Sequence, residues 1–184
     1  MRHTNNGVNI GFRIQITMKK ILRILFVLIG LVILTLSISY LVSGGPSTIL
    51  SHVRIQKPSE TVFDFISDMR NELIWNPDVM FMEKVSEGPV SKGTRFRAKW
   101  HMSDTLDVVI VDYERASNVT FVNGGPLEVR LEVKLKAIGS ETEMESRFIA
   151  TPHGFIRAIF PIFKKKMKSQ EQENMVNLKK ALEK

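Results

Sequence analysis

The sequence predicts an α+β protein in which one transmembrane helix precedes a single domain, built from an antiparallel sheet and a long C-terminal helix. Three observations lead to this fold class. An uninterrupted apolar run extends from Ile24 to Val42, apolar and charged residues alternate strictly from Leu127 to Ala137, and apolar residues after Pro152 recur at helical spacing. A period of two residues is typical of a half-buried strand, and a period of three to four is typical of an amphipathic helix.

The apolar run is long enough to cross a bilayer once. An α-helix rises about 1.5 Å per residue, so the run covers roughly the 30 Å hydrocarbon core. Lys19, Lys20 and Arg23 come directly before it, and no acidic residue precedes it. Because basic flanks tend to stay in the cytoplasm, we expect a single-pass helix with a cytoplasmic N-terminus and an extracytoplasmic domain. The alternative is a cleaved signal sequence, for which Val42-Ser43-Gly44 is a poor cleavage site.

The chain divides into four segments around this helix. Residues 1–17 are a disordered tail or a mis-called start, because Met18-Lys19-Lys20 is typical of the natural beginning of such an anchor. Residues 18–43 form the transmembrane signal-anchor helix, and residues 44–47 are a linker. Residues 48–184 have the length of one domain, which is enough to bury a single core.

Composition argues against several classes of function. Of the 26 Lys and Arg residues five precede the span, whereas all 19 acidic residues follow it, so the domain itself is close to neutral. A nucleic-acid partner is therefore not expected, since such binders concentrate positive charge on the folded domain. The chain has no cysteine, and its four histidines are widely separated, so we expect neither a metal nor a cofactor.

The domain begins with a strand and two short helices. Thr48–Gln56 is rich in β-branched and apolar residues and is ended by Lys57-Pro58. Pro58 suits the first turn of a helix. The buried stripe of that helix consists of Val62, Phe63, Phe65 and Ile66. A short helix or turn at 71–75 ends at Asn76-Pro77, and strand-like sequence continues to Thr151.

The alternating stretch predicts a β-hairpin with a defined register. Gly139-Ser140 suits a two-residue turn with glycine first. That turn places Lys136 opposite Glu143, Lys134 opposite Glu145 and Glu132 opposite Arg147. On the other face it pairs Leu135 with Met144 and Leu131 with Phe148. Each pair contributes only tenths of a kcal/mol, so the pairs matter chiefly as evidence for the register.

The other elements are less sharply defined. Phe96, Ala98, Trp100 and Met102 alternate with charged residues, and this places His101 on the polar face. Leu106–Tyr113 and Val119–Asn123 are further strands whose registers the pattern does not fix. The C-terminal helix carries its apolar face at Ile156, Ile159, Phe160, Phe163, Met167, Leu178 and Leu182. Pro161 should kink this helix or split off its first turns.

The chain resembles the START-like superfamily, often called SRPBCC, which includes polyketide cyclase/dehydrase and lipid-transport domains. The order of elements is similar, and so are the sequence phrases at residues 55–68, Trp75-Asn76-Pro77, Glu87-Gly88-Pro89 with Lys92-Gly93-Thr94, and 178–183. The resemblance covers nearly all of residues 50–184. It implies a helix-grip fold, in which a curved antiparallel sheet wraps around the long helix and leaves a deep apolar ligand pocket.

Large apolar side chains are the candidate lining of that pocket. They are Phe63, Trp75, Phe96, Trp100, Leu131, Phe148, Phe160 and Phe163. The implied partner is a hydrophobic small molecule or a lipid. The alternative is that these side chains form an ordinary core without a hollow.

Catalytic groups are harder to find in the sequence. Asp107, Asp112, Tyr113 and Asn123 fall on inward or ambiguous strand positions, but none is paired with a histidine at a telling spacing. Other acids have simpler explanations. Asp104 and Asp107 suit a solvated hairpin end, and Asp64 and Asp68 suit exposed or capping positions. Catalysis is therefore unsupported by the sequence, though not excluded.

Four lysines in the C-terminal helix have two interpretations. Lys164, Lys165, Lys166 and Lys168 directly follow an apolar segment, and such a segment suits docking onto anionic lipid headgroups. Alternatively they solvate the outer face of the helix, as Glu171, Glu173 and Glu183 would further along.

Two classes of function follow. The first is a membrane-anchored module that binds or transfers a hydrophobic small molecule or lipid in an apolar cavity. The second is an enzyme of the polyketide cyclase/dehydrase type that acts in the same pocket. A protein-interaction domain with a filled cavity is a further alternative.

Overall fold

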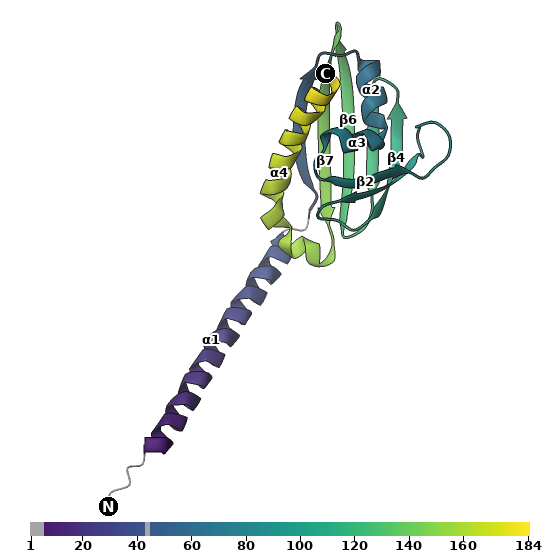
Figure 1. The fold of residues 1–184 in the computed structure, drawn as a ribbon. Helices are drawn as coiled ribbons and strands as arrows, with labels where there is room; N and C mark the ends of the chain where they lie inside the picture. Colours follow the sequence, from purple (N-terminus) through teal and green to yellow (C-terminus); the bar gives the residue numbers. More distant parts are fainter. Residues whose placement is uncertain (1–5, 43–44) are drawn as a thin grey trace, which may run out of the picture.

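The computed structural model describes residues 6–42 and 45–184, with side chains from Met18 onward, and shows a long helix that leads into one domain (Figure 1). The elements in chain order are α1 (Asn6–Val42), β1 (Ser47–Ile55), α2 (Ser59–Ser67), the 3-10 helix η1 (Met69–Asn71), α3 (Glu72–Trp75), β2 (Val79–Lys84), β3 (Arg95–Trp100), β4 (Leu106–Glu114), β5 (Asn118–Asn123), β6 (Leu127–Ile138), β7 (Glu141–Pro152) and α4 (Gly154–Leu182).

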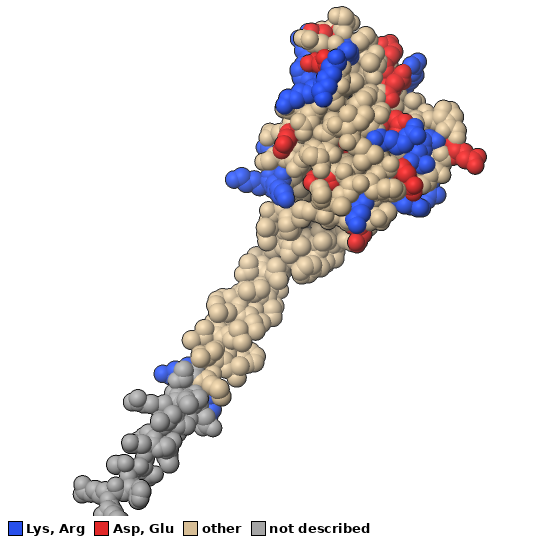
Figure 2. Space-filling view, in the orientation of Figure 1, with Lys and Arg blue, Asp and Glu red and all other residues tan. Residues whose placement is uncertain are grey.

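Helix α1 stands away from the domain. It begins at Asn6, within the segment to which the sequence assigned no fold, while residues 1–5 and residues 43–44 of the predicted anchor and linker lie outside the described residues. Its stretch Met18–Val42 is long and apolar enough to cross a membrane, and a signal sequence at this position would meet the same criteria. Figure 2 shows this stretch as a shaft of uncharged side chains with basic residues at the end far from the domain.

The seven strands form one antiparallel sheet in the order β1-β7-β6-β5-β4-β3-β2. The register of the predicted hairpin is confirmed, since Lys136 pairs with Glu143, Glu132 with Arg147 and Leu131 with Phe148. Gly139 begins the turn with φ 62°, in the left-handed region that favours glycine. Local sequence alternation therefore specified the two longest strands of the sheet.

Irregular pairing bends the other half of the sheet. The register shifts between Ile110 and Asp112 of β4 and between Val79 and Phe81 of β2. An extra residue in one strand of a pair increases local twist and bends the strand. The sheet consequently curves into a half-barrel around a concave inner face (Figure 1).

Helices cover parts of this concave face and complete the core. Its largest fully buried side chains are Phe63, Phe96, Ile55, Ile110, Leu178, Val62 and Val119. Helix α4 includes Pro161, and Figure 1 shows its first turns at a marked angle to the remainder, as predicted for a proline that cannot donate a helical hydrogen bond. The predicted α+β helix-grip fold with one N-terminal apolar helix is confirmed.

The end of α1 contacts the beginning of α4. The Ser39 hydroxyl donates a hydrogen bond of 2.6 Å to the carbonyl oxygen of Ala158. The guanidinium carbon of Arg157 lies 4.5 Å from the centre of the Tyr40 ring, which is cation–π geometry. These contacts join the apolar helix to the domain at the first turns of α4.

Candidate functional site

A cavity of about 570 Å³ lies between the concave face of the sheet and α4. Helices α2, η1 and α3, strands β3 to β7 and the loops between them supply the rest of its wall, which is mainly apolar. Six of the residues predicted from the sequence line this cavity: Trp75, Trp100, Leu131, Phe148, Phe160 and Phe163. They come from α3, β3, β6, β7 and α4, so the fold brings together residues spread over half of the chain.

Phe63 and Phe96 lie outside the cavity wall. Both are fully buried in the core. The ring of Phe63 meets Tyr113 edge-on, with 5.0 Å between ring centres and 77° between ring planes. Neighbouring core side chains surround these two rings on all sides, so neither ring borders the cavity.

The cavity wall also includes two glutamates that were not predicted from the sequence to lie there. Glu72 reaches it from α3 and Glu171 from α4, on facing parts of the wall. The Asn76 side-chain amide donates a hydrogen bond of 3.2 Å to Glu72. Nearby, the buried Asn174 accepts a hydrogen bond of 3.3 Å from Gln170. The mostly apolar cavity therefore has a polar region between α3 and α4.

Burial changes the acidity of both carboxyl groups. Removal from water raises the pKa of Glu72 to about 7; the charge of Glu171 raises it too, while hydrogen bonds from Asn76 and Trp100 lower it. Burial likewise raises the pKa of Glu171 to about 7. Near neutral pH, this pair can both donate and accept a proton. Such groups can hydrogen-bond a polar part of a ligand or act as a general acid and base.

The spacing of α4 contained a signal for one of these residues. The rhythm of three and four residues that runs through Phe163 and Met167 continues through Glu171, Asn174 and Leu178. The assignment of Glu171 to the solvated outer face was wrong, because this rhythm turns it toward the cavity. Glu72 offered no comparable signal, since α3 is only four residues long and shows no period.

The acids proposed for catalysis on the strands are engaged elsewhere. Asp107 pairs with Arg95 at 3.1 Å and with Arg97 at 3.4 Å, and it does not line the cavity. Asp112 accepts a hydrogen bond of 2.7 Å from the Asn118 side chain. These acids therefore belong to surface networks of the sheet.

Tyr113 and Asn123 have different positions. Tyr113 packs against Phe63 in the core and does not line the cavity. Asn123 does line it, but its side-chain oxygen accepts a hydrogen bond of 2.7 Å from the backbone N–H of Val129. This bond ties Asn123 to the beginning of β6.

The remaining acids lie at the edges of the domain. Hydrogen bonding by the Arg115 guanidinium lowers the pKa of the exposed Asp64, and Arg70 does the same for Asp68. Asp68 also accepts a backbone hydrogen bond from Arg70 at the beginning of η1, which is a capping role. Asp104 is exposed at the rim of the cavity.

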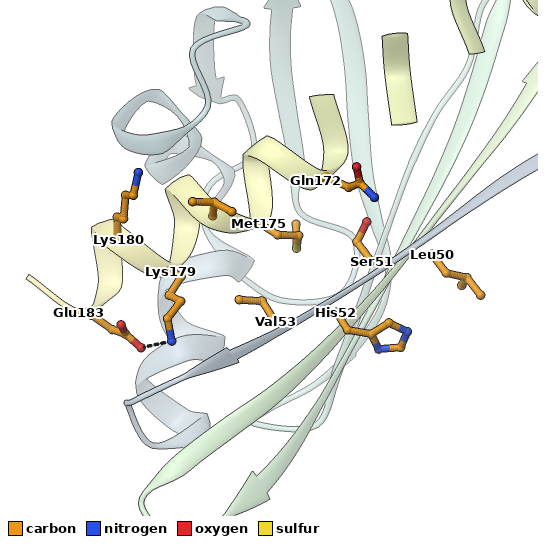
Figure 3. Close-up of a pocket in the computed structure, with 10 residues that line it drawn as sticks. Leu50, Ser51, His52, Val53, Gln172, Met175, Lys179, Lys180 and Glu183 are labelled. Atoms are coloured by element: carbon orange, nitrogen blue, oxygen red, sulfur yellow. Dashed lines mark hydrogen bonds and ion pairs between the residues drawn. The ribbon is translucent and has the colours of Figure 1, made fainter. Parts of the chain in front are cut away.

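A second hollow of about 630 Å³ is a groove between β1 and the later part of α4. Figure 3 shows Ser51 and Val53 on the side of β1 that faces Met175, with Leu50 and His52 pointing away. Lys179 pairs with Glu183 at 2.8 Å in this groove. The groove is open, and the charges of Lys179 and Glu183 neutralise each other.

The four lysines predicted to meet a membrane are all exposed on α4. Lys166 also borders the cavity, where its ammonium group lies 3.9 Å from the sulfur of Met102. Within residues 6–42 and 45–184, no three His, Asp or Glu side chains come close enough together to hold a metal ion.

Comparison with solved structures identifies the fold independently. TTHA0849 from Thermus thermophilus aligns at a TM-score of 0.62 with 14% identity, over 74% of this chain and 97% of that chain. The ZhuI aromatase/cyclase from Streptomyces sp. R1128 aligns at 0.57 with 10% identity, over 74% and 93%. A START superfamily protein from Mycobacterium smegmatis aligns at 0.57 with 14% identity, over 74% and 94%. At these identities the similarity shows the fold alone.

Sequence comparison identifies the family. No curated protein matches the chain significantly. However, the family model described as "Polyketide cyclase / dehydrase and lipid transport" matches residues 48–183. This match spans well over half of the chain and confirms the resemblance found in the sequence phrases. The chain therefore belongs to the polyketide cyclase/dehydrase and lipid-transport family.

Proposed function

We propose that this protein binds a hydrophobic small molecule, such as a lipid, in the cavity between the sheet and α4. Helix α1 acts as a single-pass membrane anchor with a cytoplasmic N-terminus, and the domain lies on the other side of the membrane. The protein takes its ligand from the adjacent leaflet and holds or transfers it.

The cavity is the observation that carries this proposal. Its volume of about 570 Å³ falls within the range of roughly 300 to 1,000 Å³ that is typical of small-molecule sites. Protein interiors are otherwise packed as densely as organic crystals, and unfilled apolar space lowers stability. An apolar ligand in this cavity would leave water and contact apolar side chains, among them Trp100, Leu131 and Phe160.

The location of the cavity supports a source in the membrane. Its wall includes Ile156, Ile159 and Phe163 from the first turns of α4, which contact the end of α1. A molecule that enters on this side has the shortest path from the bilayer.

Native mass spectrometry of the full chain in detergent micelles tests this proposal. A discrete additional mass, released on denaturation and identified as an apolar molecule, is the expected result. The matched control is Leu131→Trp, which fills part of the cavity with a larger apolar side chain and should reduce occupancy. A mass without ligand that persists after incubation with lipid extract contradicts carriage of a hydrophobic molecule.

A second candidate function is catalysis of the cyclase type, favoured by the Glu72 and Glu171 pair in the cavity. Two carboxyl groups that titrate near neutrality provide the proton transfers that a cyclisation or dehydration requires. The structural similarity to an aromatase/cyclase is consistent with this alternative. Under this alternative, Glu72→Gln should stop turnover of a poly-β-ketone substrate while ligand binding, measured by mass spectrometry, persists.

A further inference from the structure

The first turns of α4 carry apolar side chains on every side, apart from Arg157, whose guanidinium packs over the Tyr40 ring of α1. Ile156, Ile159 and Phe163 line the cavity on one side. On the other side Phe155 is 69% exposed and Ile162 is 72% exposed. A helix that is apolar all round is normally buried on all sides. The apolar side chains on the outer side of these turns are therefore exposed, whereas such side chains are normally covered by other apolar groups.

The contact with α1 indicates what covers that outer side. Ser39 contacts Ala158 about 15 residues after Ile24, which corresponds to roughly 22 Å of helix. The hydrocarbon core of a bilayer is about 30 Å thick. If the core begins after Arg23, the last basic residue before the span, this contact lies about 8 Å inside the hydrocarbon boundary on the side of the domain. Interfacial helices bury their apolar face to a similar depth, roughly 5 to 10 Å. The first turns of α4 lie at the same depth.

Residues next to these turns have the chemistry of a membrane interface. Met102 is 67% exposed, and its sulfur lies 3.9 Å from the Lys166 ammonium group. Lys164, Lys165 and Lys168 are exposed on α4 just after the apolar turns. Figure 2 shows basic side chains over the lower part of α4, close to the apolar shaft. Apolar side chains followed by lysines are typical of helices that lie in the headgroup layer of anionic membranes.

We propose that the lipid-facing surface, formed by Met102, Phe155, Ile162, Lys164, Lys165 and Lys168, is embedded in the headgroup layer of the leaflet in which α1 ends. Its partner is anionic phospholipid: the apolar side chains contact acyl chains, and the lysines pair with phosphates. Because the exposed Met102 belongs to this surface and also lines the cavity, we place the opening of the cavity on the lipid side. The inference rests on the proposed membrane anchoring by α1.

Depth-dependent fluorescence quenching of the full chain in vesicles tests this surface. The chain contains no cysteine, so a single introduced cysteine is labelled uniquely. We would place it at Phe155, at Ile162 or at Val176, in vesicles of phosphatidylcholine and phosphatidylglycerol with a nitroxide-bearing lipid. Val176 is the matched control, because it is an apolar residue 50% exposed on the later part of α4.

The expected result is quenching at positions 155 and 162 that is at least several-fold stronger than at position 176. Equal quenching at all three positions overturns the proposal. Labels at 155 and 162 that are shielded from water but not quenched by lipid also overturn it, since a second copy or another protein would then cover these turns.

Charged substitutions provide a second test that does not disturb the core. With the label at Met102, the double variant Phe155→Asp and Ile162→Asp should lose its quenching, because α1 stays inserted while the domain lifts from the lipid. Val176→Asp should leave the quenching unchanged. Quenching that survives the double substitution overturns the role assigned to Phe155 and Ile162.

The lipid-facing surface and the proposed ligand function can be contradicted separately. Strong quenching together with a cavity that stays empty in mass spectrometry supports the lipid-facing surface and contradicts lipid carriage. A bound lipid without quenching supports lipid carriage and contradicts the lipid-facing surface. Extraction of the full chain from vesicles by alkaline carbonate identifies the remaining case, in which α1 itself does not span the membrane.

Discussion

The cavity and the groove on either side of α4 are similar in size and opposite in chemistry. Their volumes are about 570 and 630 Å³. In the groove, Lys179 bonds to Glu183 and to the carbonyl oxygen of Arg54, and Glu183 also accepts a hydrogen bond of 2.7 Å from the backbone of Gln56. In the cavity, apolar side chains surround two carboxyl groups whose pKa values burial has raised.

This difference shows that volume does not identify a ligand site. The groove has little to offer a ligand, because Lys179 and Glu183 already bond to each other and its surface is open to water. The cavity holds apolar surface without a packing partner, together with two acids whose pKa values burial has raised. In the cavity, a bound ligand can cover the apolar surface and hydrogen-bond the acids. In the groove it can do neither.

The largest expected effect separates the filled core from the cavity wall. Phe63→Ala removes a fully buried ring and should lower the free energy of unfolding by about 3 to 5 kcal/mol. Phe148→Ala, which faces the cavity, should cost markedly less because one side of this ring already borders empty space. Urea unfolding followed by tryptophan fluorescence measures both. Equal losses would show that the space beside Phe148 is packed.

A second prediction concerns the dependence of stability on pH. The pKa of Glu72 and of Glu171 is near 4.5 when unfolded and about 7 when folded. The folded state thus binds protons at these two groups more tightly, so their contribution to stability is fully present below pH 4.5 and is lost as the pH rises through 7. For one such group the decrease is on the order of 3 kcal/mol.

Substitution of the acids isolates this effect. The double variant Glu72→Gln and Glu171→Gln should lose most of the decrease between pH 5 and pH 8, as measured by urea unfolding at each pH. Glu183→Gln in the groove is the matched control with the opposite sign. Hydrogen bonding by Lys179 lowers the pKa of Glu183, so its contribution is present above its ordinary pKa and is lost as the pH falls. An unchanged pH profile in the double variant would mean that the two cavity acids are solvated.

A third prediction compares two positions on the same helix. Phe163→Glu places a charge in the cavity and should weaken binding of an apolar ligand by at least about 100-fold, because the carboxylate must stay hydrated. Val176→Glu places the same group in the groove and should leave binding unchanged. Titration with a fluorescent fatty acid measures both affinities. Weaker binding in the Val176 variant alone would transfer the site to the groove.

The smallest effect is expected at the exposed rim of the groove. Lys180→Ala should change the free energy of unfolding by no more than about 0.5 kcal/mol, since this side chain is exposed and lacks an ion-pair partner among the described residues. Ligand affinity should also stay the same. A larger loss in urea unfolding would indicate that the groove stabilises the fold more than its contacts suggest.

Much of the fold could be predicted because local patterns determine it. Strict alternation and a two-residue turn set the register of β6 and β7, and helical spacing identified the inner face of α4. The bulge in β4 was not predictable, since Val108–Val111 is a continuous apolar run without alternation. In such a run both faces appear buried, and the position of an extra residue depends on the neighbouring strand.

The candidate site was only partly predictable for a related reason. Alternation shows that a side chain lies on the concave face, but it does not show what that side chain meets there. Phe96 meets other core side chains, whereas Trp100, on the same face of the same strand, meets the cavity. That difference depends on the distance between α4 and the sheet, which is set by the whole domain. The burial of Glu72 has the same origin.

Methyl NMR of the methionines in the full chain, during titration with an apolar ligand, tests most directly whether the cavity is the binding site. Met69, Met144 and Met167 line only the cavity, Met175 lies between the cavity and the groove, and Met80 borders neither. We expect the signals of Met69, Met144 and Met167 to shift with the ligand while that of Met80 stays fixed. A shift confined to Met175 would place the ligand in the groove and contradict this account.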